Sequence, residues 1–297
     1  MTEFIIETAG LCKLFKSKPA LRGLDLRVPA GSIFGFLGRN GAGKTTTIKL
    51  LMGMLKPDAG TATVFGLPVH DPRAAVQIRQ RIGFVTEDKD LYPYMTVDQV
   101  IRFTRSFFPK WRDDLAQRYL KIFELPLGQK IPSLSKGMRS KLMLLLAISR
   151  GAELLILDEP TDGLDPATVE DVLRELVALA AAEGITIFFS SHQLAEVDQI
   201  ADYVSIIDHG AVIVSDSLDD LKGRYRRLHV VFEREPCAPV HWPSGVEHLR
   251  QEGRTVSILA SGNVDGILEQ AQSIPGASIE QFPVTLKEIF LEHVRSN

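Results

Sequence analysis

The chain has 297 residues, of which 45% are hydrophobic and 24% are charged, and its formal net charge at pH 7 is −3. This composition is typical of a folded globular protein and excludes fibrous and disordered classes, while the slightly acidic balance excludes a general attraction to nucleic acid. The longest apolar runs, such as Leu142–Ile148, are far shorter than the roughly 20 residues of a membrane-spanning helix, so we expect this chain not to cross a membrane.

Residues 1 to about 86 are predicted to form short strands and one helix. Ser32–Leu37 is mostly apolar, is flanked by two glycines and is too short for a helix, which favours a buried strand. Gly43–Leu55 then has apolar residues at helical spacing and ends just before a proline. The order is strand, glycine-rich loop and helix.

The glycine-rich loop at 38–45 matches the phosphate-binding pattern Gly-x4-Gly-Lys-[Ser/Thr] in the context that this pattern requires. Glycines allow successive N–H groups to face phosphate oxygens, and the following helix N-terminus adds a partial positive charge. Lys44 is suited to the β and γ phosphates of a nucleotide, and the Thr45 hydroxyl to Mg²⁺. The predicted nucleotide-binding residues here are Gly38, Arg39, Asn40, Gly41, Ala42, Gly43, Lys44, Thr45 and Thr46.

From about 88 to 150 the chain is rich in aromatic residues, has helical spacing and lacks a convincing strand, which predicts a helical insertion. Strands are predicted again at Leu154–Leu157 and Ile185–Phe189, with an amphipathic helix between them that ends at Gly184. Near-continuous apolar strands that alternate with such helices indicate a largely parallel sheet covered on both faces.

Residues 224–297 have a weaker pattern, with three prolines close together and short alternating stretches such as Thr255–Leu259. We expect a small separate α+β domain there, and a first domain over 1–223. The basic cluster Arg224–Arg227 is interpreted as a solvated linker, because one short cluster is weak support for contact with a membrane surface.

Two adjacent carboxylates, Asp158 and Glu159, follow the predicted strand at Leu154–Leu157. Open α/β sheets bind ligands at the carboxyl ends of their strands. Asp158 can hold Mg²⁺ through a water molecule, and Glu159 can orient the attacking water and accept its proton. A GTPase is disfavoured, because no asparagine of the chain is followed by lysine, as the guanine-reading Asn-Lys-x-Asp element requires.

Further motifs appear in a fixed order along the chain. Leu134-Ser135-Lys136-Gly137-Met138 opens an apolar helix before Asp158, the segment 158–166 reads Asp-Glu-Pro-Thr-Asp-Gly-Leu-Asp-Pro, and His192 follows the strand at 185–190. In this order and spacing residues 4 to about 223 resemble the ATP-binding subunit of an ABC transporter, specifically of the ABC-2 type exporters. The resemblance implies a P-loop ATPase fold with a mixed or parallel sheet and an N-terminal antiparallel β subdomain.

The resemblance also implies roles for individual residues. Phe15 would stack on adenine, although a core position is the alternative. Ser135 and Gly137 would contact the γ phosphate of ATP bound to another subunit. Asp165 would lie at the contact between subunits, and as the residue before Pro166 it is also a good helix N-cap. His192 would sense the γ phosphate and join Glu159 as a catalytic residue.

Two departures from the family pattern stand out. The usual signature Leu-Ser-Gly-Gly-Gln has Lys136 and Met138 at its third and fifth positions, which leaves open whether a homodimer is equally active at both sites. Glu87 stands where a glutamine is usual. Its carboxylate can coordinate Mg²⁺ beside Thr45 and Asp158, and we expect it to make the site more strictly dependent on the metal.

The resemblance implies that ATP closes a dimer and that hydrolysis opens it, in a homodimer or with a different ATPase subunit. Separate membrane permease subunits would receive the force through residues near 88–111, at the cytoplasmic face of the membrane. We interpret most aromatic side chains of that segment as core residues, with a docking groove as the alternative. The cysteines, Cys12 and Cys237, form no disulfide framework, as is typical of the reducing cytoplasm.

Two other functions stay open from the sequence. One is a soluble ABC-type ATPase that acts on DNA or ribosomes, although no long coiled-coil insertion, zinc-binding cysteines or second ATPase cassette is visible. The other is a regulatory subunit with weak turnover, which the altered signature favours and the intact Lys44, Asp158, Glu159 and His192 oppose.

Overall fold

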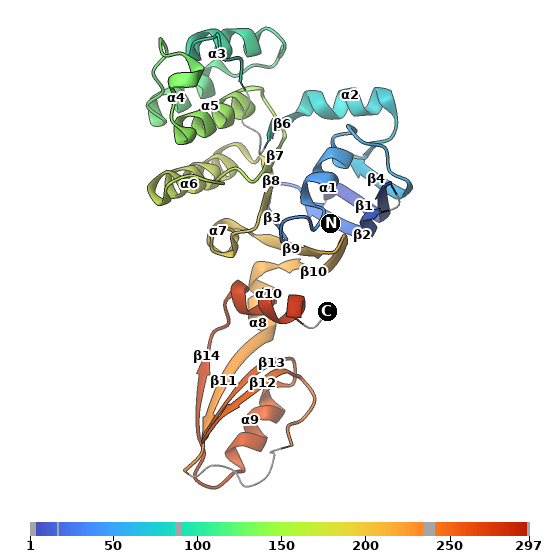
Figure 1. Cartoon of the computed structure of the whole chain (residues 1–297), viewed down its shortest axis with the longest axis vertical. Helices are drawn as coiled ribbons and strands as arrows, with labels where there is room; N and C mark the ends of the chain where they lie inside the picture. Colours follow the sequence, from blue (N-terminus) through green and yellow to red (C-terminus); the bar gives the residue numbers. More distant parts are fainter. Residues whose placement is uncertain (1–3, 17, 87–90, 234–240, 296–297) are drawn as a thin grey trace. The chain divides into compact units, whose positions relative to one another are not determined.

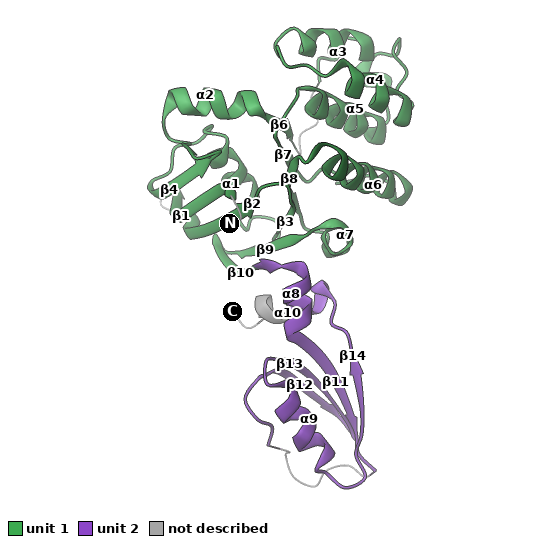
Figure 2. Cartoon of the chain, turned by 180° about the vertical axis from the view of Figure 1, so that it is seen from behind, with its two compact units in different colours: residues 1–215 green, residues 216–297 purple. Residues whose placement is uncertain are grey.

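A computed structural model describes residues 4–16, 18–86, 91–233 and 241–295. The chain divides into two compact units, Met1–Ser215 and Asp216–Asn297 (Figure 2). The boundary predicted from the sequence lies after residue 223, whereas helix α8 (Leu218–Arg224) belongs to the second unit.

An antiparallel sheet opens the first unit. It has the order β2-β1-β4-β5, formed by β1 (Phe4–Phe15), β2 (Lys18–Pro29), β4 (Ala59–Val64) and β5 (Leu67–Pro68). This is the predicted N-terminal β subdomain. Its inward side chains share one core with helix α1 (Lys44–Leu51) and with strands of the second sheet.

The second sheet has six strands in the order β10-β9-β3-β8-β7-β6. They are β3 (Ile33–Leu37), β6 (Ile82–Val85), β7 (Leu154–Asp158), β8 (Thr186–Ser191), β9 (Tyr203–Asp208) and β10 (Ala211–Ser217). The pairs from β9 to β6 are parallel. His209 and Gly210 join β9 to β10, and their positive φ angles of 45° and 83° suit a two-residue hairpin turn, which makes the sheet mixed, as expected.

Helix α2 (Pro72–Arg81) was missed by the sequence analysis, which expected only one helix before residue 86. Its apolar face is weak, because the buried positions are two alanines and Ile78. The end signals are clear, however. Asp71 caps the helix by accepting a hydrogen bond from Ala74 N at 2.8 Å, and proline occupies the first turn.

Replacing Asp71 by alanine is expected to lower the free energy of unfolding by about 1 kcal/mol, because the first turn of α2 loses its cap. Urea-induced unfolding of the full chain measures the change. Asp71→Asn is the matched control, because asparagine caps equally well. An equal loss in both variants would contradict this role.

Helices α3 (Val97–Arg105), α4 (Asp113–Ile122) and α5 (Lys136–Ser149), with the short 3-10 helix η1 (Ile131–Ser133), form the predicted helical insertion. They lie together beyond β6 at one end of the first unit (Figure 1). No helix among the described residues is both long enough and apolar enough to span a membrane.

The interpretation of the aromatic residues as mostly core was wrong. Four of them have exposed side chains, and their rings contact one another in a chain, with centroids 5.0–5.9 Å apart. We call them the aromatic patch: Tyr92, Tyr94, Phe103 and Phe107. Phe108 and Trp111 are half-buried.

Helix α6 (Pro166–Glu183) ends as expected at Gly184, which has a φ of 64°. It lies with α7 (Leu194–Ile200) on the side of the sheet opposite α1 (Figure 1). Its buried stripe is formed by Val172, Leu173, Leu176 and Leu179. Val177 of the same helix is 40% exposed.

The second unit is a four-stranded antiparallel sheet in the order β12-β13-β11-β14. Its elements are β11 (Tyr225–Val231), β12 (Val246–Glu252), β13 (Thr255–Ser261), β14 (Ser278–Phe282), α9 (Val264–Gln272) and α10 (Leu286–Arg295). Side chains of β11, β13 and α9 form its core. The basic cluster is not a solvated linker, because it runs into β11 and its Arg224 and Arg227 pair with Asp216 and Glu288.

Candidate functional site

The loop between β3 and α1 makes a tight turn that depends on glycine. Gly41 and Gly43 have φ angles of 83° and 116°, a region that side chains disfavour. A Cβ at Gly43 would also lie 2.9 Å from the carbonyl oxygen of Ala20. Ala42 N donates to Arg39 O at 3.0 Å, which closes the turn. Gly43 is therefore required by both backbone conformation and space, and Gly41 by backbone conformation.

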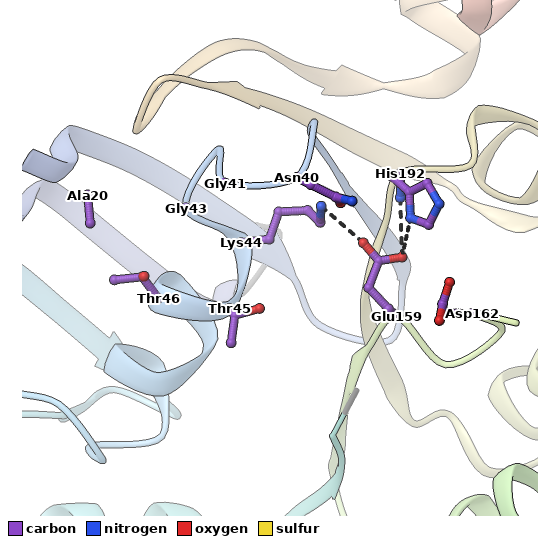
Figure 3. A pocket seen from close by; sticks show the side chains of 10 residues that line it. All are labelled: Ala20, Asn40, Gly41, Gly43, Lys44, Thr45, Thr46, Glu159, Asp162 and His192. Atoms are coloured by element: carbon purple, nitrogen blue, oxygen red, sulfur yellow. Dashed lines mark hydrogen bonds and ion pairs between the residues drawn. The ribbon is translucent and has the colours of Figure 1, made fainter. Parts of the chain in front are cut away.

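Lys44 begins α1 and is only 6% exposed. Its Nζ donates to Gly38 O at 2.8 Å and lies 3.0 Å from Glu159 Oε1 (Figure 3). A buried ammonium is stable only when it is paired in this way. The contact joins the glycine-rich loop to the residue that follows β7.

Glu159 lies just beyond β7 with a φ of 48°, an uncommon conformation for a residue other than glycine. Its Oε2 is 2.8 Å from His192 Nδ1 and accepts a longer hydrogen bond from His192 N at 3.4 Å. Its Oε1 is buried and has no hydrogen bond of normal geometry among the described residues, although it faces Lys44. The side chain is thus placed between a cation and an imidazole.

Asp158, the last residue of β7, is 2% exposed. Its Oδ1 accepts a hydrogen bond from Ser190 Oγ at 2.6 Å, and the same hydroxyl accepts one from Glu159 N at 3.1 Å. Ser190 thereby fixes both acidic residues against β8. The sequence analysis did not single out this serine.

The loop, Glu159 and His192 surround a pocket of about 380 Å³ (Figure 3). It is lined by Ala20, Asn40, Gly41, Gly43, Lys44, Thr45, Thr46, Glu159, Asp162 and His192. Eight of these ten residues were predicted from the sequence. Ala20 and Asp162 were not predicted. Ala20 belongs to β2, which is distant in sequence from the other residues of the site.

Glu196, on α7, does not line this pocket and is 4% exposed. Its Oε2 accepts hydrogen bonds from Thr161 Oγ1 at 2.7 Å and from Ser191 Oγ at 3.0 Å. Burial raises the pKa of this carboxyl. Only its position four residues after His192 in the chain could have drawn attention to it in the sequence.

The other predicted residues lie outside the pocket lining. Ser135 caps α5 by accepting from Met138 N at 3.1 Å, and a Cβ at Gly137 would lie 3.3 Å from Thr168. Asp165 accepts hydrogen bonds from Thr168 N and Oγ1, which cap α6 and lower the pKa of its carboxyl. The predicted cap is therefore present.

Phe15 is the last residue of β1 and is 47% exposed. The alternative that it is a core residue is therefore wrong. Lys136 forms an ion pair with Asp162 at 3.3 Å. Glu87 lies outside the described residues.

An amide-lined loop at a helix N-terminus, a buried lysine and a strand-end carboxylate paired with histidine form the site of a P-loop nucleotide triphosphatase. Comparison with known proteins narrows this class. A family profile described as "ABC transporter" matches residues 21–162, and one described as "AAA domain, putative AbiEii toxin, Type IV TA system" matches residues 127–198.

Several curated proteins are similar to this chain. The bacitracin transport ATP-binding protein BcrA of Bacillus licheniformis is 37% identical over 225 residues, which cover 75% of this chain and 73% of that protein. The daunorubicin/doxorubicin resistance ATP-binding protein DrrA of Streptomyces peucetius is 38% identical over 73% of this chain and 66% of its own. The uncharacterized ABC transporter ATP-binding protein YdbJ of Bacillus subtilis is 31% identical over 96% of this chain and 92% of that protein.

Solved structures agree on the fold. CbiO1 of Clostridium perfringens, part of the ABC transporter complex cbiONQ, matches with a TM-score of 0.66 and 26% identity over 74% of this chain and 91% of its own. A dimeric post-hydrolysis structure of the ATP-binding cassette MJ0796 bound to ADP and Pi matches with a TM-score of 0.64 and 21% identity. The match covers 72% of this chain and 98% of that one. The chain belongs to the family of ABC transporter ATP-binding subunits, and its activity is that of an ABC ATPase.

Proposed function

We propose that this chain hydrolyses ATP with Glu159 and His192 in order to drive export through separate membrane permease subunits. The observation that carries this proposal is the continuous contact from Lys44 through Glu159 to His192 along the pocket. Lys44 would bind the β and γ phosphates, and Glu159 would accept a proton from the attacking water. His192 would hold that carboxylate in place. The names of BcrA and DrrA support transport of small molecules and, through resistance, their export.

Magnesium fits the residues of this site. Asp158 is a buried carboxylate directly before Glu159, which lines the pocket, and Thr45 also lines the pocket. Mg²⁺ is usually held by one or two such protein groups together with substrate phosphates, whose charge it neutralises. We propose that Thr45 and Asp158 hold the ion, and that Glu87 joins them.

A second subunit would complete the ATP site. Ser135 is exposed at the N-terminus of the 14-residue helix α5 and does not line the pocket of its own chain. Because helix N-termini favour anions, this end of α5 is suited to the γ phosphate of ATP bound to another subunit, with Gly137 and Asp165 at the contact. The dimer would be a homodimer or a heterodimer with a second ATPase subunit, and Phe15 would stack on adenine.

The first compact unit would be the ATP-binding domain, and its aromatic patch would bind the permease at the cytoplasmic face of the membrane. Contiguous exposed apolar side chains of this kind are typical of interaction surfaces. The patch lies at the helical insertion, which the sequence analysis named as the route of force transfer.

Replacing Tyr94 and Phe107 together by aspartate is expected to abolish co-purification of a multi-span partner with this chain from membranes. The reason is that two charges would be buried without partners in the contact. The affinity for ATP should change less than threefold, because no residue of the patch lines the pocket.

Val177→Asp is the matched control, since Val177 is an exposed apolar residue on α6. This variant should retain the partner. Exclusively ribosomal or soluble partners of the unmodified chain would contradict the proposed function.

A further inference from the structure

Glu196 is a buried carboxyl for which the proposed reaction has no use. One of its oxygens accepts two hydrogen bonds, and the other, Oε1, is buried and accepts none from the part of the chain that the structure describes. Unsatisfied buried polar groups are rare in native proteins and call for an explanation. The two partners of the other oxygen, Oε2, indicate what this side chain does in the fold.

Thr161 lies two residues after Glu159, and Ser191 directly precedes His192. The pairing of β7 with β8 ends at Asp158 and Ser190, so Glu159 and His192 lie beyond the last pair of the sheet. Glu196 Oε2 joins the two segments immediately past that point. This one oxygen atom therefore links the two segments beyond the point where the backbone pairing of β7 and β8 ends.

Each segment also forms a turn with hydrogen bonds of its own. Asp162 N donates to Glu159 O at 3.2 Å and Leu164 N to Thr161 O at 3.1 Å, and Glu159 itself has a left-handed φ. Such a conformation persists only where the surrounding structure fixes it. On the other side, Ser191 Oγ accepts from Gln193 N at 2.9 Å and donates to Glu196. Both turns are thus fastened to the same carboxyl oxygen.

We propose that Glu196 is a positioning residue that sets the contact between Glu159 and His192 by holding Thr161 and Ser191 with one hydrogen-bond acceptor. It acts through these two side chains and does not touch the nucleotide. The inference rests on the proposed roles of Glu159 and His192. The proposed role requires an oxygen that accepts both hydrogen bonds and does not require a negative charge. The amide oxygen of a glutamine at position 196 should therefore fulfil it.

Steady-state ATP hydrolysis by the full chain tests this proposal with paired variants. Glu196→Ala should lower kcat at least tenfold, because small displacements of reacting groups have large effects on rate, while the dissociation constant for ATP stays within threefold. Glu196→Gln should keep kcat within threefold of the unmodified chain. Thr161→Val should lower kcat at least fivefold, and Thr161→Ser, which keeps the hydroxyl, less than threefold.

Hydrogen exchange followed by mass spectrometry gives a second readout that needs no activity. In Glu196→Ala the segments 159–164 and 191–193 should exchange faster than in the unmodified chain, and in Glu196→Gln they should not. Normal kcat in Glu196→Ala, equally slow turnover in Glu196→Gln, or unchanged exchange would each overturn the proposal. A normal kcat in Glu159→Gln would instead refute the catalytic role of Glu159, and the exchange measurement would still decide on Glu196.

Discussion

Replacement of Lys44 by alanine is expected to weaken ATP binding at least 100-fold, or by about 3 kcal/mol. The side chain is buried and lies between Gly38 O and Glu159 Oε1 at the floor of the pocket. Its removal deletes the cation that would meet the β and γ phosphates. It also leaves the Glu159 carboxylate without its cation, so that this carboxylate would repel the nucleotide.

Titration with a fluorescent ATP analogue measures the affinity, and circular dichroism checks that the variant is folded. Lys49→Ala is the matched control, because Lys49 is an exposed lysine of the same helix. The control should bind ATP like the unmodified chain. Affinity of Lys44→Ala within fivefold of the unmodified chain would refute nucleotide binding at this loop.

Replacement of Glu159 by glutamine is expected to lower kcat by a factor of about 10² to 10³, because an amide cannot accept the proton of the attacking water. ATP binding should be retained, since glutamine keeps the shape of the side chain and removes a negative charge near the phosphates. The hydrogen bond to His192 can also persist through the amide oxygen. Bound ATP should therefore accumulate in a closed dimer.

Phosphate release measures kcat, and size-exclusion chromatography with ATP measures the dimer. Glu170→Gln, an exposed position on α6, is the matched control and should behave like the unmodified chain. Unchanged turnover in Glu159→Gln would contradict a general base at this position. A slow unmodified chain that nevertheless binds ATP would support the regulatory subunit.

Much of the fold could be predicted from local patterns. The strands β3, β7 and β8 are buried at every residue, and so they appear in the sequence as apolar runs between turn residues. The helix α2 was missed because its buried face consists largely of alanine, which gives little hydrophobic contrast. The aromatic patch was misjudged because a sequence pattern does not show whether an aromatic side chain packs in the core or stays exposed.

By itself the sequence determined the glycine-rich loop and the acidic pair, because a run of consecutive residues dictates the backbone conformation of a loop and the end of a strand. Only the tertiary structure decided that Lys44 meets Glu159, more than one hundred residues away, and that Glu159 meets His192. These contacts depend on the order of β3, β8 and β7 in the sheet. The roles of Ser190 and Glu196 were also decided there, since hydrogen bonds between distant segments leave no periodic pattern in the chain.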